Sequence, residues 1–425
     1  MSGVAGARAS ETPVIEAGGE RMHALDAVRA VAMFAGILLH GAIGYMENRQ
    51  YEWPLSDRSQ STLFDILVFV VHSHRMQAFF LVAGFFGAMM LARKGTRELI
   101  RNRLLRIGVP AGVGLVVLVP LTILTMAVAL RASGRADPDE PAWEPFLEFY
   151  RRRPADEWLD PLHLWFLVYL LPMYGLGWGL TRLAGRASGG VRALAARRRD
   201  ALAASAWCAP LLALVTLPFM FHMREWSVDT PRDLVPTPHI WLYYAVFFVV
   251  GWVMWDARRA FMEMLARCWR VHLGIGGACL VLLLFALFPG QKHRSTDEGL
   301  WIIVDTVARV LLSLGAWTLV FGMLGAFLRW FTTPSRAWRY AADASYWCYL
   351  AHLPLIFLFG ALLAPVPISC VLKFPLVILG TVGVLLPTYH WLVRPTLIGR
   401  VLNGPRPAAR AGMNSGGGVS ALRAS

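Results

Sequence analysis

Long apolar runs recur along the whole chain, and they constrain its fold more than any other feature. Ten of these runs are long enough to cross the hydrocarbon core of a bilayer, which takes about 20 residues of helix. They fall near residues 25–45, 61–92, 104–130, 160–184, 203–221, 239–257, 271–289, 300–328, 341–363 and 373–398. This pattern predicts an all-α, polytopic membrane protein with about ten transmembrane helices.

The composition agrees with a membrane protein. Hydrophobic residues make up 56% of the 425 residues, charged residues make up 16%, and the mean hydropathy is +0.50. Ordinary soluble domains do not need that much apolar surface. The net charge of +14 could indicate nucleic-acid binding, but the arginines lie in short loops between apolar runs, where basic residues fix topology. We therefore expect a lipid bilayer as partner and no nucleic acid.

The distribution of basic residues predicts the topology. With ten spans both termini lie on one side, and the segments on that side hold 26 Lys and Arg residues against 12 in the opposite segments. The positive-inside rule places both termini in the cytoplasm. Residues 1–22 are then a flexible cytoplasmic tail, residues 23–400 a single ten-helix domain, and residues 401–425, rich in Gly, Ala, Arg and Ser, a disordered cytoplasmic tail.

Two further features concern the connections between the runs. The 61–92 run is longer than a crossing needs and carries HSHR in its middle, so we expect it to be broken, kinked or steeply tilted. Tryptophans such as Trp53 and Trp143 in outer segments and Trp255 and Trp330 in inner segments fit interfacial belts. The acidic and basic loop 131–157 is either a solvated connection or a contact for an external substrate.

Ionisable groups inside the membrane are functional candidates, because each costs a few kcal/mol unless it is paired or hydrated. His40 ends the stretch LDAVRAVAMFAGILLH, eleven residues after Arg29, and on a helix that spacing is about 16 Å. It corresponds to about half the hydrocarbon thickness. Asp26 stands one turn before Arg29, and we expect it to orient or neutralise that arginine. His72, His74 and Arg75 form a second cluster in HSHR.

Other polar residues in the runs allow two interpretations. His163 begins HLWFL, and His352 follows Asp343, Ser345 and Tyr349 in the ninth run. For each of them the alternative to a functional role is a hydrogen bond to a neighbouring helix. Asp305 and Arg309 are four residues apart and could pair with each other. The histidines lack the i, i+4 spacing of a helical zinc pair, and the five cysteines form no metal-ligand or redox pair, so we expect no metal.

The first predicted cytoplasmic loop, RKGTRELIRNRLLRIGVP, carries paired arginines. Arg103 and Arg106 are three residues apart on one helical face, with Arg97 and Arg101 nearby. Such a face could bind phosphates bidentately. The alternative is a role in topology and in binding anionic lipids.

These pieces together resemble the acyltransferase 3 family of integral membrane proteins, whose mark is an arginine and a histidine separated by ten residues. The closest resemblance is to its glucans biosynthesis protein C branch, which adds succinyl groups to periplasmic glucans. It covers about residues 22–404 and rests on six motifs in order: LDAVRAVAMFAGILLH, HSHRMQAFFLVAGFF, RNRLLRIGVP, HLWFL, YLAHLPL and HWLVRPTLIGRVLNG.

The resemblance implies a multi-pass O-acyltransferase of a bacterial-type inner (cytoplasmic) membrane. The enzyme would move an acyl group, succinyl or else acetyl, from cytoplasmic acyl-CoA to a hydroxyl of a periplasmic or cell-surface glucan or polysaccharide. Acyl-CoA is then a co-substrate, and no permanently bound cofactor is expected. The implied catalytic residues are His40, Arg29, Asp26, His72 and Arg75, with Arg103 and Arg106 binding the phosphates of the donor.

The same resemblance implies a pocket for the acceptor or the acyl group. Its residues are Gln77, Phe80, Gly84, His163, Trp165, Tyr349 and His352. Two positions depart from the family pattern. Ala83 stands where the family usually has a serine, and His74 stands where this branch is expected to have an aromatic residue, so the role of His74 stays open.

The chemistry of the residues leaves two mechanisms open. A neutral His40 could act as general base, or it could carry the acyl group transiently. His72 and Arg75 would bind the acyl carboxylate or the sugar, or stabilise the oxyanion. The alternative function is a proton-coupled membrane transporter of a small anionic or sugar substrate, and the third is a structural scaffold. The absence of an internal repeat and the paired arginines disfavour the transporter.

Overall fold

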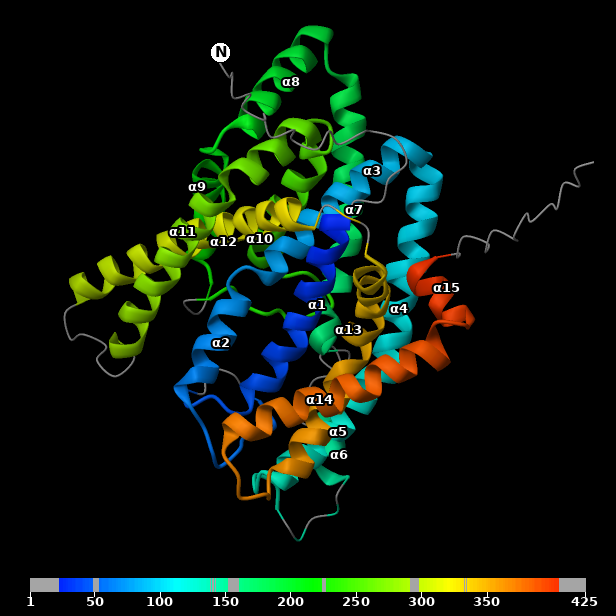
Figure 1. Ribbon diagram of the computed structural model, residues 1–425, viewed down its shortest axis with the longest axis vertical. Coiled ribbons are helices and arrows are strands. Elements are labelled where there is room, and N and C mark those ends of the chain that lie inside the picture. The colour runs from blue at the N-terminus through cyan, green and yellow to red at the C-terminus, as the bar shows by residue number, and fades with distance from the viewer. Residues whose placement is uncertain are drawn as a thin grey trace, which may run out of the picture.

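The computed structural model describes residues 23–48, 53–137, 139, 141, 143–151, 160–223, 227–290, 298–331, 333 and 335–404. Within these residues the chain forms helices and no strand, so the predicted all-α class is confirmed (Figure 1). The predicted tails fall mostly outside the described residues. The helix α15 (Leu397–Asn403), however, extends past the predicted domain boundary at residue 400.

Every one of the ten predicted apolar runs is helical. The helices are α1 (His23–Ile43), α2 (Thr62–His72), α3 (Arg75–Arg103), α4 (Val109–Val113), α5 (Val119–Ala132), α7 (Trp165–Arg186), α9 (Cys208–Met220), α10 (Pro238–Met254), α11 (Arg258–Gly290), α12 (Glu298–Trp330), α13 (Arg336–Leu363) and α14 (Cys370–Thr388). The connecting helices α6 (Glu144–Arg151) and α8 (Gly189–Ala204) lie between runs. The predicted break at HSHR is confirmed, because α2 ends at His72 and α3 starts at Arg75.

The number of crossings depends on how the segments are divided. Within the described residues, seven helical segments are long and apolar enough to cross a membrane, or eight if α8 and α9, bent by 107°, form one span. One of the seven is Thr62–Ala132 with 71 residues. At 1.5 Å per residue it is about 3.5 times the hydrocarbon thickness, and its helical path is kinked at Gly95, whose φ of 78° glycine adopts readily. The count of ten and the cytoplasmic termini stay predictions.

Three π-helical turns occur among the described residues, and each ends two residues before a proline. They are η1 (Leu104–Gly108) before Pro110, η2 (Gly114–Leu118) before Pro120 and η5 (Tyr389–Val393) before Pro395. A proline cannot donate to the carbonyl four residues earlier, and its ring clashes with that carbonyl, so the preceding turn widens. Because η1 carries Arg106 and directly follows Arg103, this widening helps to set the path of the helix that bears both arginines.

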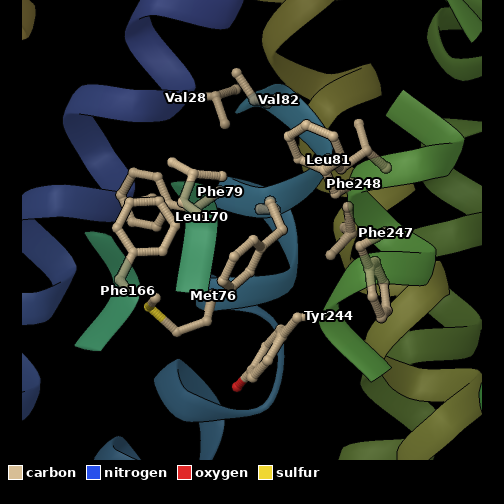
Figure 2. Packing of buried hydrophobic residues seen from close by; sticks show 14 of the residues in the cluster. Val28, Met76, Phe79, Leu81, Val82, Phe166, Leu170, Tyr244, Phe247 and Phe248 are labelled. Atoms are coloured by element: carbon tan, nitrogen blue, oxygen red, sulfur yellow. The ribbon is translucent and has the colours of Figure 1, made fainter. Parts of the chain in front are cut away.

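Close helix contacts build the core around α1. This helix packs against α13, and α3 packs against α10. A Cβ at Gly84 of α3 would collide with the carbonyl of Phe248, so the backbones of α3 and α10 touch. Figure 2 shows the aromatic layer between α3, α7 and α10, where the rings of Phe79 and Phe166 lie 5.5 Å apart. This layer lies next to the candidate site.

The helix α1 is shorter than its neighbour α13. It ends at Ile43, whereas α13 continues past His352 to Leu363. The part of α13 from His352 to Leu363 is about 16 Å long and extends beside the chain that connects α1 to α2. The chain between α1 and α2 fills part of the space that α1 leaves free. Leu55 from this chain lies against Gly44 and Gly360, where a Cβ at Gly360 would collide with it.

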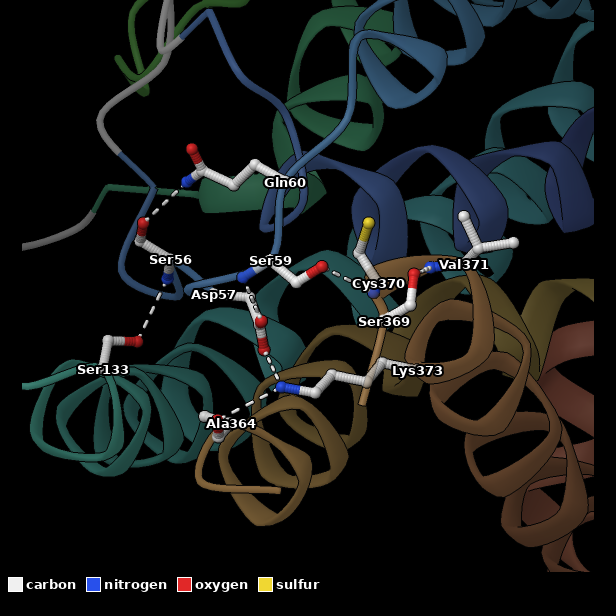
Figure 3. Close-up of polar contacts among 10 residues, drawn as sticks. All are labelled: Ser56, Asp57, Ser59, Gln60, Ser133, Ala364, Ser369, Cys370, Val371 and Lys373. Carbon is white, nitrogen blue, oxygen red and sulfur yellow. Dashed lines mark hydrogen bonds and ion pairs between the residues drawn. The ribbon is translucent and has the colours of Figure 1, made fainter. Parts of the chain in front are cut away.

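Polar contacts hold this connector in place. Lys373 Nζ of α14 lies 2.7 Å from Asp57 Oδ2, and both side chains are 2% exposed (Figure 3). The same Nζ donates to the carbonyl of Ala364 at 3.2 Å. Ser59 Oγ accepts a hydrogen bond from the backbone of Cys370. Irregular backbone inside a membrane domain needs such internal partners, because lipid offers none.

Candidate active site

His40 lies against His352, a residue 312 positions later in the sequence. Their nitrogens, His40 Nδ1 and His352 Nε2, are 2.7 Å apart. The two rings differ by only 18° in plane with centroids 5.0 Å apart, so they meet edge to edge, as an imidazole–imidazole hydrogen bond requires. On its other side, His352 Nδ1 lies 2.7 Å from the carbonyl oxygen of Tyr349. His352 is 1% exposed.

These contacts determine which nitrogen of each ring carries the proton. The carbonyl of Tyr349 can only accept, so His352 Nδ1 donates to it, and in the neutral ring Nε2 is left as an acceptor. His40 Nδ1 therefore donates to His352 Nε2. The lone pair of His40 then lies on Nε2. A neutral imidazole with a free Nε2 can take a proton or attack a carbonyl carbon.

His163 of the turn η4 (Leu162–Leu164) and Tyr349 of α13 support this histidine pair. His163 Nε2 donates to the carbonyl of Leu350 at 3.0 Å, and the Tyr349 hydroxyl donates to the carbonyl of His163 at 2.8 Å. The His163 ring meets the His352 ring edge to face, 5.1 Å between centroids. The structure thus brings together three predicted pocket residues beside His40.

Arg75 opens α3 next to α1. A Cβ at Gly36, one turn before His40, would collide with Arg75 Nη1, so the guanidinium rests on the backbone of α1. His40 interacts electrostatically with Arg75, His163 and His72 as well as with His352. The first turn of a helix leaves backbone N–H groups without intrahelical partners, so Arg75 and the start of α3 together present positive charge near His40.

Buried polar atoms without a partner gather in this region. Native proteins leave few such atoms, and a group that stays unsatisfied calls for an explanation. Within the described residues, Arg75 Nε, His163 Nδ1 and Trp53 Nε1 are buried and lack a hydrogen-bond partner. Arg75 and Trp53 offer donors here, and His163 Nδ1 offers a lone pair because its Nε2 carries the proton. A ligand with both acceptors and donors would satisfy all three.

Trp53 makes contacts at the site that the sequence analysis did not predict. Its ring lies nearly parallel to His40, 10° between planes and 5.9 Å between centroids, and also contacts Phe357 at 4.9 Å. It therefore lies at the site, and its place in an interfacial belt stays a prediction. A sequence signal did exist, since a purely solvated connector does not need the large apolar pair Trp53 and Leu55 beside Asp57.

The other residues of HSHR take structural positions at the break between α2 and α3. His72 Nε2 donates to the carbonyl of Val228 at 2.8 Å, and it still interacts electrostatically with His40. His74 is the N-cap residue of α3, and its Nδ1 lies 3.2 Å from Ser73 Oγ. Gln77 is fully buried and donates to the Tyr243 hydroxyl at 3.2 Å, while its Oε1 has no partner among the described residues.

The remaining predicted pocket residues form a layer around the site. Phe80 and Trp165 pack against Tyr244, with ring centroids 4.7 and 5.4 Å from it. The space next to Gly84 is filled by the backbone of α10. These three residues contact other aromatic rings or the backbone of α10, so the structure gives them a packing position next to the predicted pocket.

A cluster of arginines lies at the other end of α1. Arg29, Arg103 and Arg106 all interact electrostatically with Tyr346, whose hydroxyl donates to the carbonyl of Arg106 at 2.5 Å. Arg103 stacks over the ring of Tyr174 at 4.4 Å and has a buried Nε without a partner within the described residues. Asp26 lies 3.5 Å from Arg29, as predicted. Arg29 therefore belongs spatially with the two predicted phosphate-binding arginines.

The C-terminal helix supports this cluster. A Cβ at Gly404 would collide with Arg106 Nη2, so the guanidinium lies on the backbone that ends α15. Asn403 Nδ2 donates to the carbonyl of Asp343 at 2.9 Å and to the Tyr389 hydroxyl at 3.1 Å. The closing motif HWLVRPTLIGRVLNG is thereby connected to the arginine cluster.

The other polar candidates have local partners. Arg309 pairs with Asp305 at 2.7 Å, as the spacing suggested, and also donates to the carbonyls of Met220 and Met223. Ser345 donates to the carbonyl of Ala342. The described part of the chain contains no group of three His, Cys, Asp or Glu side chains placed to hold a metal ion. The expectation of no metal stays a prediction.

Comparison with known proteins adds to this geometry. A family model described as "Acyltransferase domain" matches residues 22–390. The glucans biosynthesis protein C of Salmonella typhimurium is 24% identical over 400 residues, which cover 92% of this chain and 96% of the relative. The protein of the same name from Salmonella schwarzengrund is 24% identical over 397 residues, 91% of this chain and 96% of the relative. No solved structure has a significant match to the chain.

Proposed function

Because this chain belongs to the acyltransferase 3 family and is a multi-pass membrane O-acyltransferase, we propose that it transfers a succinyl group from cytoplasmic acyl-CoA to a hydroxyl of a periplasmic glucan. The glucan is inferred from the name of the relatives, and the succinyl group is inferred from the resemblance to their branch. The proposed location is the inner membrane. The observation that supports the proposal best is the hydrogen-bonded chain from the Tyr349 carbonyl through His352 to His40, which leaves His40 Nε2 free.

In the proposed reaction His40 Nε2 removes the proton from an acceptor hydroxyl. The oxygen attacks the thioester carbonyl carbon, a C–O bond forms, and the C–S bond breaks. The proton on His40 then passes to the leaving thiolate, so the products are the ester and the free thiol. Arg75 and the start of α3 face the developing oxyanion or the carboxylate of the succinyl group. In the second route the acyl group first forms a bond to His40 Nε2 and then moves to the acceptor.

The two ends of α1 support separate entrances for the substrates. Arg29, Arg103 and Arg106 suit the phosphates of the acyl donor, and the arginines would bind them through charge-assisted hydrogen bonds. From this cluster to His40, α1 rises by about 16 Å. The donor would therefore reach His40 from one end of α1, and the acceptor would reach it from the end at which the connector lies.

The test uses purified protein in lipid nanodiscs, with succinyl-CoA or acetyl-CoA and a glucose hexasaccharide, and mass spectrometry of the product. We expect transfer that is lost in His40→Gln and retained in His390→Ala, since His390 is exposed on η5. Arg75→Gln should reduce succinyl transfer more than acetyl transfer, because only the succinyl group carries a carboxylate. Full transfer by His40→Gln at equal protein level would refute the mechanism.

Two further measurements separate the alternatives. Incubation with the donor alone, followed by mass spectrometry of the peptide that contains His40, detects an acyl-histidine and so decides between the two routes. Family membership supports the enzyme over the transporter. Substrate uptake into vesicles without any acylated product would contradict that assignment.

A further inference from the structure

Trp53 covers His40 at the end of α1 that lies opposite the arginine cluster. The indole ring and the imidazole ring are nearly parallel, with centroids 5.9 Å apart. Phe357 of α13 packs on the indole at 4.9 Å. Trp53 is therefore in direct contact with the candidate catalytic histidine.

The indole N–H has no partner. Trp53 Nε1 is buried, and no acceptor lies within hydrogen-bond distance among the described residues. Tryptophan N–H groups usually find an acceptor when they are buried. The nearby His163 Nδ1 is also buried without a partner, and it is a lone-pair acceptor because His163 Nε2 donates to Leu350.

The unpaired donor of Trp53 and the unpaired acceptor of His163 together indicate the chemistry of the ligand. A thioester group offers only acceptors, so it cannot satisfy the lone pair of His163 Nδ1. A carbohydrate carries hydroxyl groups on neighbouring carbons, and each of them both donates and accepts. A carbohydrate can therefore pair with both kinds of unpaired atom, the donor Trp53 Nε1 and the acceptor His163 Nδ1. The set of unpaired atoms fits a polyol.

The connector that carries Trp53 is fixed at several points. The carbonyl oxygen of Trp53 accepts a hydrogen bond from Arg135 Nη1 at 2.7 Å. Two residues later Leu55 is 2% exposed against α13, and Asp57 is held by Lys373. Trp53 is thus held in place before any ligand binds, as a binding residue needs to be.

We propose that Trp53 binds the carbohydrate acceptor, its indole N–H donating a hydrogen bond to a hydroxyl next to the one that reacts. This role rests on the proposed function, since it takes the acceptor to be a carbohydrate. Trp53 is a positioning residue in this proposal. It holds the acceptor and takes no part in proton transfer.

The test compares Trp53→Phe, which keeps an aromatic ring and loses the N–H, with the unmodified protein in nanodiscs. We expect the KM for a glucose hexasaccharide to rise about tenfold, equivalent to about 1.4 kcal/mol, which is the scale of one hydrogen bond. The KM for succinyl-CoA should not change, because the donor's phosphates bind at the arginine cluster at the other end of α1. Trp143→Phe is the matched control, because Trp143 is 60% exposed and should leave both KM values unchanged.

The outcomes separate the two proposals. An unchanged KM for the hexasaccharide in Trp53→Phe, or an equal rise in both KM values, overturns the role of Trp53. If the unmodified protein transfers no acyl group, the proposed function fails, and hexasaccharide binding measured by calorimetry decides the role of Trp53 alone. Binding that is about tenfold weaker in Trp53→Phe supports it. Equal binding, or no binding to the unmodified protein, overturns it.

Discussion

Replacing Lys373 by methionine measures how much the buried ion pair with Asp57 contributes to stability. Both side chains are 2% exposed, their charged atoms are 2.7 Å apart, and Lys373 has a second partner in the carbonyl of Ala364. In Lys373→Met the carboxylate of Asp57 keeps only its hydrogen bond from the backbone of Ser59. A buried charge left without its partner destabilises a protein by about 3–5 kcal/mol. We expect a loss of that size.

The double variant Asp57→Asn/Lys373→Met isolates the interaction between the two charges. Neither residue then carries a charge, so most of the desolvation penalty disappears. We expect the double variant to be more stable than either single variant, with a free energy of unfolding within about 2 kcal/mol of the unmodified protein. The exposed pair of Arg259 and Glu263 is the control, because Arg259 is 82% exposed and Arg259→Met should change stability little.

The assay can use the protein's own thiols. Cys370 is buried, is not in a disulfide, and donates a backbone hydrogen bond to Ser59 Oγ of the connector. A thiol-reactive dye therefore reports thermal unfolding, and mass spectrometry of the labelled peptides shows whether Cys370 reacts first. At about 2 °C per kcal/mol for a large domain, Lys373→Met should lower Tm by about 6–10 °C. A shift below about 2 °C, or a double variant as unstable as the two single losses added together, would refute the reasoning.

Three further predictions concern single contacts. His352→Leu leaves His40 Nδ1 without its acceptor, so the transfer rate should fall by about 10²-fold or more while Tm stays unchanged. His352→Gln offers an acceptor oxygen and should retain more activity in the same rate assay. Gly404→Ala should displace Arg106 and raise the KM for acyl-CoA severalfold while the acceptor KM stays constant, and a rise in both values would argue against a donor site there. Gly84→Ala should separate α3 from α10 and cost about 1–3 kcal/mol in thermal unfolding, whereas Gly112→Ala, with open space around it, serves as the control.

The sequence predicted those features of the fold that depend on local pattern. Apolar run length predicted helices, and HSHR predicted the break between α2 and α3, because polar groups in the middle of a run favour irregular backbone. The pairing of Asp305 with Arg309 followed from helical spacing alone. Each of these depends on residues close together in the chain.

The candidate site was only partly predictable, because it depends on contacts between distant segments. His40 and His352 were both candidates, but nothing in either run showed that they would share a hydrogen bond across 312 residues. The depth of His40 was inferred from its spacing to Arg29. The structure adds that α1 ends at Ile43 and that a connector packs beyond it. The contact of Trp53 with His40 was not predicted, because a tryptophan in a short connector has the same local pattern whether it faces lipid headgroups or packs on a histidine.

The spacing between Arg29 and His40 along α1 determines the length of the acyl donor that can react. If phosphates bind at the arginine cluster and the acyl carbon reacts at His40, the donor needs an arm of about 16 Å between the two groups. A short activated acyl compound, such as an acyl phosphate, cannot occupy both positions at once. The enzyme would thus reject such donors by length alone, whatever acyl group they carry. Inserting or deleting one turn of α1 would change the length of donor that fits.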